Sequence, residues 1–239
     1  MLSDRDILKL MESKDIVIYP FYEDCLAPDG YYVHIMPIVK FYRGYGELNF
    51  AGKQEDFEKK HLKKVDLSNS DYKLKIRPQE SALVATFEEL GVSKRVGGKF
   101  IPSMVSRVPL HISEGVLVPG WNESAPGVYT VCLTNLSPSK TICIEASYKK
   151  DNKVYWGDQI GRIRFEYPSS DVMKGYDESV YKYPRAREPQ APVSWMRFSE
   201  LKKRGMPLDP KTAPEGSKLA VDVIESLDAF SEDGKRRKK

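Results

Sequence analysis

A succession of short apolar segments between residues 72 and 167 constrains the fold of this chain more than any other feature of its sequence. Each segment has about four to eight residues, and Gly, Pro, Asn or Ser separates it from the next, as is typical of all-β domains. No internal repeat or low-complexity stretch interrupts the succession. The pattern predicts a mainly β fold, with strands over residues 73–76, 82–88, 97–103, 110–113, 115–118, 128–135, 141–149 and 160–167.

The part of the chain that precedes these segments predicts one helix and further strands. Ser3 as the N-cap and Asp6 three residues later predict a short capped amphipathic helix over residues 2–13. Two strands follow, over residues 16–21 and 31–42. The charged stretch 52–64 predicts a solvated loop or a short helix, in which His61 lies at the surface.

The composition changes after Pro168. Residues 168–215 are rich in Pro, Tyr and basic side chains, which predicts an extended arm. Residues 218–230 place five apolar side chains on one helical face, which predicts an amphipathic helix available to a protein partner. The basic end, GKRRKK, favours a solvated tail over a nucleic-acid or targeting role. We therefore expect a β domain in 1–167, an arm or lid in 168–215, and the helix with its basic tail in 216–239.

The net charge and the spacing of the cysteines and histidines limit the classes of function that the chain could have. The net charge of +4 permits an anionic ligand or nucleic acid without requiring either. The cysteines and histidines have neither CxxC nor zinc-site spacing, so we expect no disulfide framework and no metal site, unlike the zinc-dependent nucleobase deaminases. No apolar run has the length of a membrane span, and the N-terminus is charged, so we expect a cytoplasmic protein without membrane contact.

Four stretches, taken in order, resemble the dCTP deaminase branch of the dUTPase superfamily. They are LSDRDI (2–7), VLVPGW (116–121) in the place of the family's Asp-Pro-Gly-Trp turn, GDQIGRIRFE (157–166) and YKYPRAREPQAPVS (181–194). The resemblance spans about residues 2–195. It implies a β-clip, the distorted β-barrel of dUTPases, assembled as a homotrimer with nucleotide sites at subunit interfaces and a C-terminal arm that closes over a site.

The resemblance also identifies catalytic positions whose residues have changed. The family's glutamate that moves protons during deamination corresponds to Cys132, and a thiol with an ordinary pKa near ~8.5 is a poor substitute for a carboxylate base. The aspartate of the dUTPase reaction corresponds to Val118, and an earlier motif aspartate to His34. His34 or His111 could supply a replacement base, or be a hydrogen-bonded structural residue. Cys132 could be a nucleophile, although a small apolar role on a buried strand is commoner.

The phosphate contacts of the family are retained in part. Its Arg-Ser-Ser-Leu-Ala-Arg segment corresponds to residues 102–107, where Pro102 and Met104 replace an arginine and a serine. A proline cannot donate the paired hydrogen bonds by which an arginine holds phosphate oxygens. The remaining candidates for binding nucleotide or phosphate are Ser103, Ser106, Arg107, Arg162, Lys182 and Tyr183. Mg²⁺ would accompany a nucleotide bound there, and we identify no other cofactor.

Three functions follow from these observations. The first is a homotrimeric pseudoenzyme that serves as a scaffold or a nucleotide-responsive binding protein. The second is a divergent active dCTP deaminase or dUTPase, with relocated catalytic groups. The third is a nucleic-acid-binding module that uses Arg162, Arg164, the basic part of the arm and the tail. The altered catalytic positions favour the first.

Overall fold

The computed structural model describes residues 1–44, 47–48, 54–103, 108–122, 126–170, 172 and 186–190. The chain divides into two units, Met1–Trp195 and Met196–Lys239, and every described residue belongs to the first. The predicted amphipathic helix and basic tail in 216–239 therefore lie outside the described residues, as does most of the predicted arm.

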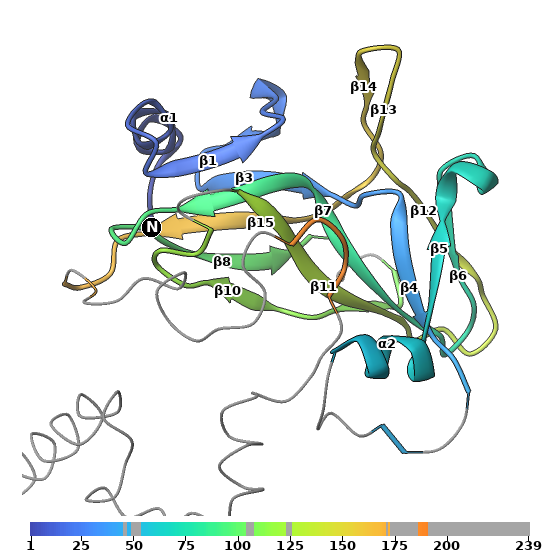
Figure 1. Ribbon diagram of the computed structural model, residues 1–239. Helices are drawn as coiled ribbons and strands as arrows, with labels where there is room; N and C mark the ends of the chain where they lie inside the picture. The colour runs from blue at the N-terminus through green and yellow to red at the C-terminus, as the bar shows by residue number, and fades with distance from the viewer. Residues whose placement is uncertain are drawn as a thin grey trace, which may run out of the picture. The chain divides into compact units, whose positions relative to one another are not determined.

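Two antiparallel sheets make up most of the described fold (Figure 1). The larger sheet has the order β5-β4-β7-β11-β9, and β1 pairs with the far end of its longest strand, β7. Its strands are β1 (Ile16–Tyr19), β4 (Ile38–Tyr42), β5 (Leu62–Asp66), β7 (Ser81–Val92), β9 (Leu110–Ile112) and β11 (Gly127–Asn135). The second sheet has the order β10-β8-β15-β3-β2. Its strands are β2 (Leu26–Ala27), β3 (Gly30–His34), β8 (Gly97–Pro102), β10 (Gly115–Leu117) and β15 (Gln159–Glu166).

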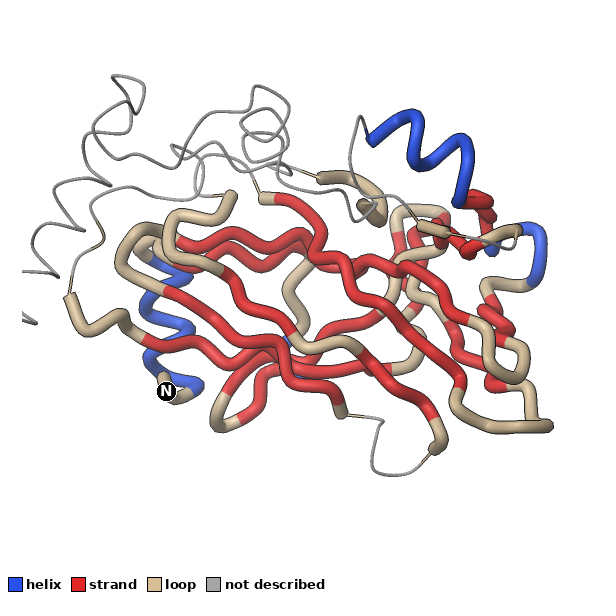
Figure 2. The backbone as a smooth tube through the Cα atoms, turned by 90° about the horizontal axis from the view of Figure 1, so that it is seen from below, coloured by secondary structure: helices blue, strands red, loops and turns tan. Residues whose placement is uncertain are grey.

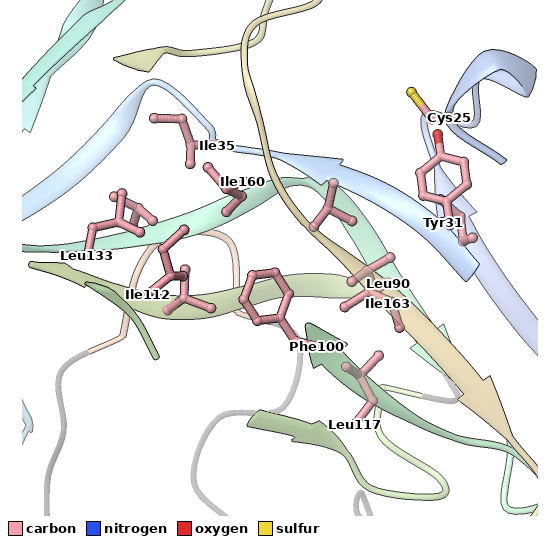
Figure 3. Packing of buried hydrophobic residues seen from close by; sticks show 14 of the residues in the cluster. Cys25, Tyr31, Ile35, Leu90, Phe100, Ile112, Leu117, Leu133, Ile160 and Ile163 are labelled. Carbon is pink, nitrogen blue, oxygen red and sulfur yellow. The ribbon is translucent and has the colours of Figure 1, made fainter. Parts of the chain in front are cut away.

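Apolar side chains from both sheets form one core. Figure 3 shows members of this cluster, among them Leu90 and Leu133 of the larger sheet and Phe100 and Ile163 of the second. All four are at most 1% exposed. Each buried side chain of this size contributes about 1.5–3 kcal/mol relative to an exposed position, so the core is the main source of stability.

Two short helices lie at opposite ends of the sheets (Figures 1 and 2). The predicted N-terminal helix is confirmed as α1 (Asp4–Glu12), where Ser3 and Asp6 form the expected reciprocal capping box. The second helix, α2 (Gln54–His61), leads directly into β5 and buries Phe57. Neither helix has the length or apolar character needed to span a bilayer, and the rest of the described chain adds no such helix.

The small elements complete the described fold. A pair of strands is formed by β6 (Lys73–Ile76) and β12 (Ile142–Glu145). A hairpin of β13 (Tyr148–Lys150) and β14 (Lys153–Tyr155) projects from the body in Figure 1. Two 3₁₀ turns, η1 (Glu23–Cys25) and η2 (Leu67–Ser70), connect strands.

The mainly β prediction is confirmed, although two of the predicted strands are divided. The segment 31–42 forms β3 and β4 with a break at Pro37, which has no N–H for a ladder, and the chain passes there from one sheet to the other. The segment 141–149 forms β12 and β13. Its break occurs because the amides of Ala146 and Ser147 donate to the carbonyls of Tyr72 and Ile35 instead of continuing a ladder.

Candidate functional site

The thiol of Cys132 lies on β11, at the position that the resemblance assigns to the catalytic glutamate. Cys132 is half-buried and contacts the apolar cluster of Phe57, Leu62 and Leu83, together with Tyr42. Burial raises the pKa of this thiol, and a hydrogen bond with Thr134 only partly opposes the effect. The neutral thiol is therefore favoured near neutral pH, and it cannot act as a carboxylate base does.

The Val-Pro-Gly-Trp turn is closed by a backbone hydrogen bond and presents no polar side chain at its first position. The amide of Trp121 donates to the carbonyl of Val118 at 2.9 Å, and Gly120 has the left-handed φ of 76° that closes the turn. Trp121 is buried, whereas Val118 is 40% exposed. An exposed valine neither accepts a proton nor orients a water molecule.

Asn135 ends β11 and has a structural role. Its buried side-chain amide donates to the carbonyls of Ile76 at 2.9 Å and Lys140 at 2.7 Å. Its Oδ1 accepts from the amide of Ser137 at 2.9 Å. Asn135 thus joins the end of β11 to β6 and to the turn that follows β11.

The predicted phosphate contacts are described only in part. Ser103 is exposed at the end of β8, and its amide donates to the carbonyl of Ile160 at 3.1 Å. The other predicted contacts in this segment and in the arm, Ser106, Arg107, Lys182 and Tyr183, lie outside the described residues.

Arg162 is described, and its guanidinium already has an anionic partner. Its Nη1 lies 2.7 Å from Asp29 Oδ1, while Arg164 reaches the other oxygen of Asp29 at 2.6 Å. One carboxylate thus joins two arginines of β15 to the turn before β3. An added anion at Arg162 would have to share this arginine with Asp29.

His34, which the resemblance assigns to the position of a motif aspartate, lies in a buried polar cluster that the sequence did not predict. Its Nδ1 lies 2.7 Å from Glu88 Oε1, and its backbone amide donates to Glu88 Oε2 at 3.0 Å. His34 is 2% exposed and Glu88 is fully buried. Trp156 lies against the imidazole at 4.9 Å between ring centroids. His111, the other histidine considered as a base, is exposed on β9.

The environment of His34 favours its charged form. Burial acts to lower the pKa of His34, but hydrogen bonds with Cys25 and Glu88 and the charge of Glu88 outweigh burial and raise the pKa to about 9. An imidazole that is protonated near neutral pH and held on both sides cannot accept a proton from water. The structure thus favours the structural interpretation of His34 over its use as a base.

Glu88 was missed because its partner, His34, is distant in sequence, whereas Cys25 is close to His34 in sequence but no local pattern links the two residues. Glu88 is 54 residues from His34 along the chain. One signal was present, since a glutamate within the apolar segment ALVATFEEL is unusual for a buried strand. Among the described residues, no group of His, Cys, Asp and Glu side chains could hold a metal ion.

The fold defines a class of protein, a mainly β chain with the dCTP deaminase/dUTPase fold. A crystal structure of 2'-deoxycytidine 5'-triphosphate deaminase from Agrobacterium tumefaciens is similar, with a TM-score of 0.50 at 15% identity over 70% of this chain. The match covers 48% of that longer chain. EIAV dUTPase matches with a TM-score of 0.31 and 17% identity over 45% of this chain and 78% of its own.

Sequence comparison identifies the family. The model of the dCTP deaminase-like family matches residues 1–167, and the chain belongs to that family. A curated relative, a dCTP deaminase, dUMP-forming, from Pseudarthrobacter chlorophenolicus, is 27% identical over 206 residues. That match covers 83% of this chain and 97% of the relative.

Proposed function

We propose that this chain is a homotrimeric nucleotide-binding protein of its family that has lost deaminase and dUTPase chemistry, and that it acts as a scaffold or a nucleotide-responsive binding protein. The observation that carries the proposal is the environment of Cys132. The half-buried thiol packs beside Phe57, Leu62 and Leu83, and the family resemblance assigns its position to the carboxylate that deamination without zinc requires.

The chemistry of the other two altered positions supports the same conclusion. Val118 has no proton-accepting atom, and His34 is engaged by Glu88 and Cys25. General acid–base catalysis needs a group that can both take and return a proton at the operating pH. None of these three side chains meets that requirement.

Nucleotide binding is proposed on the retained serine. Ser103 is exposed at the end of β8 and is available to donate to a phosphate oxygen. Ser106, Arg107, Lys182 and Tyr183 are the further contacts that the family resemblance assigns. Residues 216–230 would offer an apolar helical face to a protein partner.

Equilibrium binding and product analysis of the wild type and two variants test the proposal. We expect wild-type protein with Mg²⁺ to bind dCTP or dUTP in calorimetry and to form neither dUTP nor dUMP. Ser103→Ala should weaken binding by about fivefold, the value of one hydrogen bond near 1 kcal/mol. The matched control is Ser139→Ala, an exposed serine in the turn that follows β11. Absence of nucleotide binding would contradict the nucleotide part of the proposal.

A divergent active enzyme is the second candidate, and the relative that carries the name dCTP deaminase, dUMP-forming, favours it. In that case the wild-type protein converts dCTP to dUTP or dUMP without any substitution. Under the first proposal, conversion is absent in the wild type, and Cys132→Glu places a carboxylate on β11 where the family has one. Activity in the wild type that Cys132→Glu does not increase would support the second candidate.

A further inference from the structure

Lys40 is a buried cation on the larger sheet. It lies in the middle of β4 opposite Leu83 of β7, and its side chain is 2% exposed. Lysine is almost never fully buried unless it is paired, because desolvation of the ammonium group is costly. The burial of Lys40 therefore implies a requirement for anions at this point of the sheet.

Two carboxylates from outside the sheet meet that requirement. Glu58 of α2 places Oε2 2.9 Å from Lys40 Nζ. Glu188, which is distant in sequence, places Oε1 3.5 Å from the same nitrogen. Glu188 also forms an ion pair with Lys64 of β5, a lysine whose side chain is 56% exposed. Glu188 is thus the anion shared by Lys40 and Lys64.

The charge of Glu188 is favoured at this place. Burial acts to raise the pKa of Glu188, but hydrogen bonds and charges of Lys64 and Lys40 outweigh it and lower the pKa. Without Glu188, the two lysines would face one carboxylate, Glu58, which leaves an excess of one positive charge at the sheet surface.

Glu188 belongs to residues 186–190, a segment that lies along β11. The amide of Val128 donates to the carbonyl of Ala186 at 2.8 Å, and the amide of Gln190 donates to Thr130 Oγ1 at 3.0 Å. Gly127 permits this approach, since a Cβ there would lie 3.0 Å from backbone atoms of Ala186. The hydroxyl of Thr130 and the thiol of Cys132 are two residues apart on the strand and therefore lie on the same face of the sheet.

We propose that Lys40 and Lys64 form an anion-binding site, occupied here by the chain's own Glu188, which a phosphate-bearing ligand takes in exchange, releasing residues 186–190 from β11. The ligand class is a multiply charged phosphate, either the tail of a nucleoside triphosphate or a free polyphosphate. Such an anion carries more charge than one carboxylate, and lysine is a common phosphate-binding residue. The inference does not depend on Ser103 or on the absence of catalysis.

Because Glu188 occupies the site, a ligand has to bind the two lysines strongly enough to displace this carboxylate. Glu188 belongs to the same chain as the two lysines, so a free ligand has to compete with an intramolecular partner. A free monovalent anion would rarely displace it. The site therefore selects ligands by their charge, and its exchange should weaken as salt screens the lysines.

The test measures binding of tripolyphosphate to the full-length protein together with hydrogen exchange of two amides. Binding should accelerate exchange at Val128 and Gln190, since both amides donate across the contact of 186–190 with β11. Glu188→Gln should bind tripolyphosphate about fivefold more tightly, because the internal competitor has lost its charge. Lys64→Met should bind it at least about fivefold more weakly.

A matched control distinguishes binding at Lys40 and Lys64 from a general effect of the protein's net charge. Lys73→Met removes an exposed lysine that pairs with Glu145 at 3.8 Å. Lys73 lies on β6, which belongs to a different sheet from Lys40 and Lys64, so the affinity for tripolyphosphate should be unchanged. Equal affinities for wild type and Glu188→Gln, or binding without faster exchange at Val128 and Gln190, would overturn the proposal. Circular dichroism establishes that each variant is folded.

Separate ligands distinguish the sources of the phosphate. dCTP and tripolyphosphate should both release the segment if the phosphate tail is recognised, and release by dCTP alone would assign the site to the whole nucleotide. Release by deoxycytidine, which has no phosphate, would refute an anion site. Binding of dCTP that leaves both amides protected would overturn this inference while the proposed nucleotide-binding function stands.

Discussion

The buried pair of His34 and Glu88 makes the stability of the fold depend on one carboxylate. Glu88→Gln keeps the size of the side chain but removes its charge, and leaves the His34 imidazole without an anionic partner in the core. Removing one member of a buried ion pair typically costs about 3–5 kcal/mol. The rise in the pKa of His34 from an ordinary 6.5 to about 9 corresponds to a stabilisation of its charged form by about 3 kcal/mol. We therefore expect Glu88→Gln to lower the free energy of unfolding by about 3 kcal/mol near neutral pH.

The same pair predicts a pH dependence with a definite sign. The pKa of His34 is raised in the folded protein, so its contribution is fully present below the unfolded value of 6.5 and is lost as pH rises through about 9. Wild-type protein should lose about 3 kcal/mol of stability from this source between about pH 6 and about pH 10. Glu88→Gln should lose much less over that range.

Urea denaturation followed by tryptophan fluorescence measures both effects, because Trp156 lies against His34. The matched control is Glu89→Gln on the same strand, whose side chain is 29% exposed and pairs with Arg187. That variant should cost under about 1 kcal/mol, as partly exposed ion pairs do. A Glu88→Gln protein with the stability and pH profile of the wild type would refute the reasoning about the buried pair.

Three further predictions concern the fold and its thiols. Ser3→Ala should lower the free energy of unfolding by about 1 kcal/mol in chemical denaturation through loss of the α1 cap, and no effect would contradict the capping box. Gly30→Ala should lower the free energy of unfolding by about 2 kcal/mol or more, and the thermal midpoint by several degrees, because the added Cβ would lie 2.3 Å from the carbonyl oxygen of Ile163. An unchanged midpoint would show that β3 and β15 can separate there. Maleimide labelling of the native protein near neutral pH should modify exposed Cys143 first and buried Cys25 last, and burial and a raised pKa should slow the reaction of Cys132. If mass spectrometry finds Cys132 labelled before Cys143, the half-buried environment described for Cys132 is wrong.

Local sequence patterns predicted the strands because each depends on neighbouring residues. The capping pair Ser3 and Asp6 and the turn residues between β7 and β15 act within a few positions of where they stand. β5 was missed because LKKVD has two apolar residues among charged ones, and only pairing with β4 at the sheet edge makes it a strand.

The polar clusters could not be predicted because they join distant parts of the chain. Lys40 and Glu188 are 148 residues apart, and nothing near either residue indicates the other. Arg162 was predicted to contact nucleotide or phosphate, and its partner in the structure is Asp29 of the same chain, 133 residues away in sequence. Cys132 and Val118 were identified only through the family resemblance, since neither residue has a sequence pattern of its own.

The central claim is that nucleotide binds without being changed, and a single-turnover measurement tests it most directly. Wild-type protein in excess over radiolabelled dCTP, with Mg²⁺, should retain the label on the protein and release it as dCTP after denaturation. The half-buried thiol of Cys132 is the reason for this expectation. Recovery of dUTP or dUMP above a protein-free control would contradict the account.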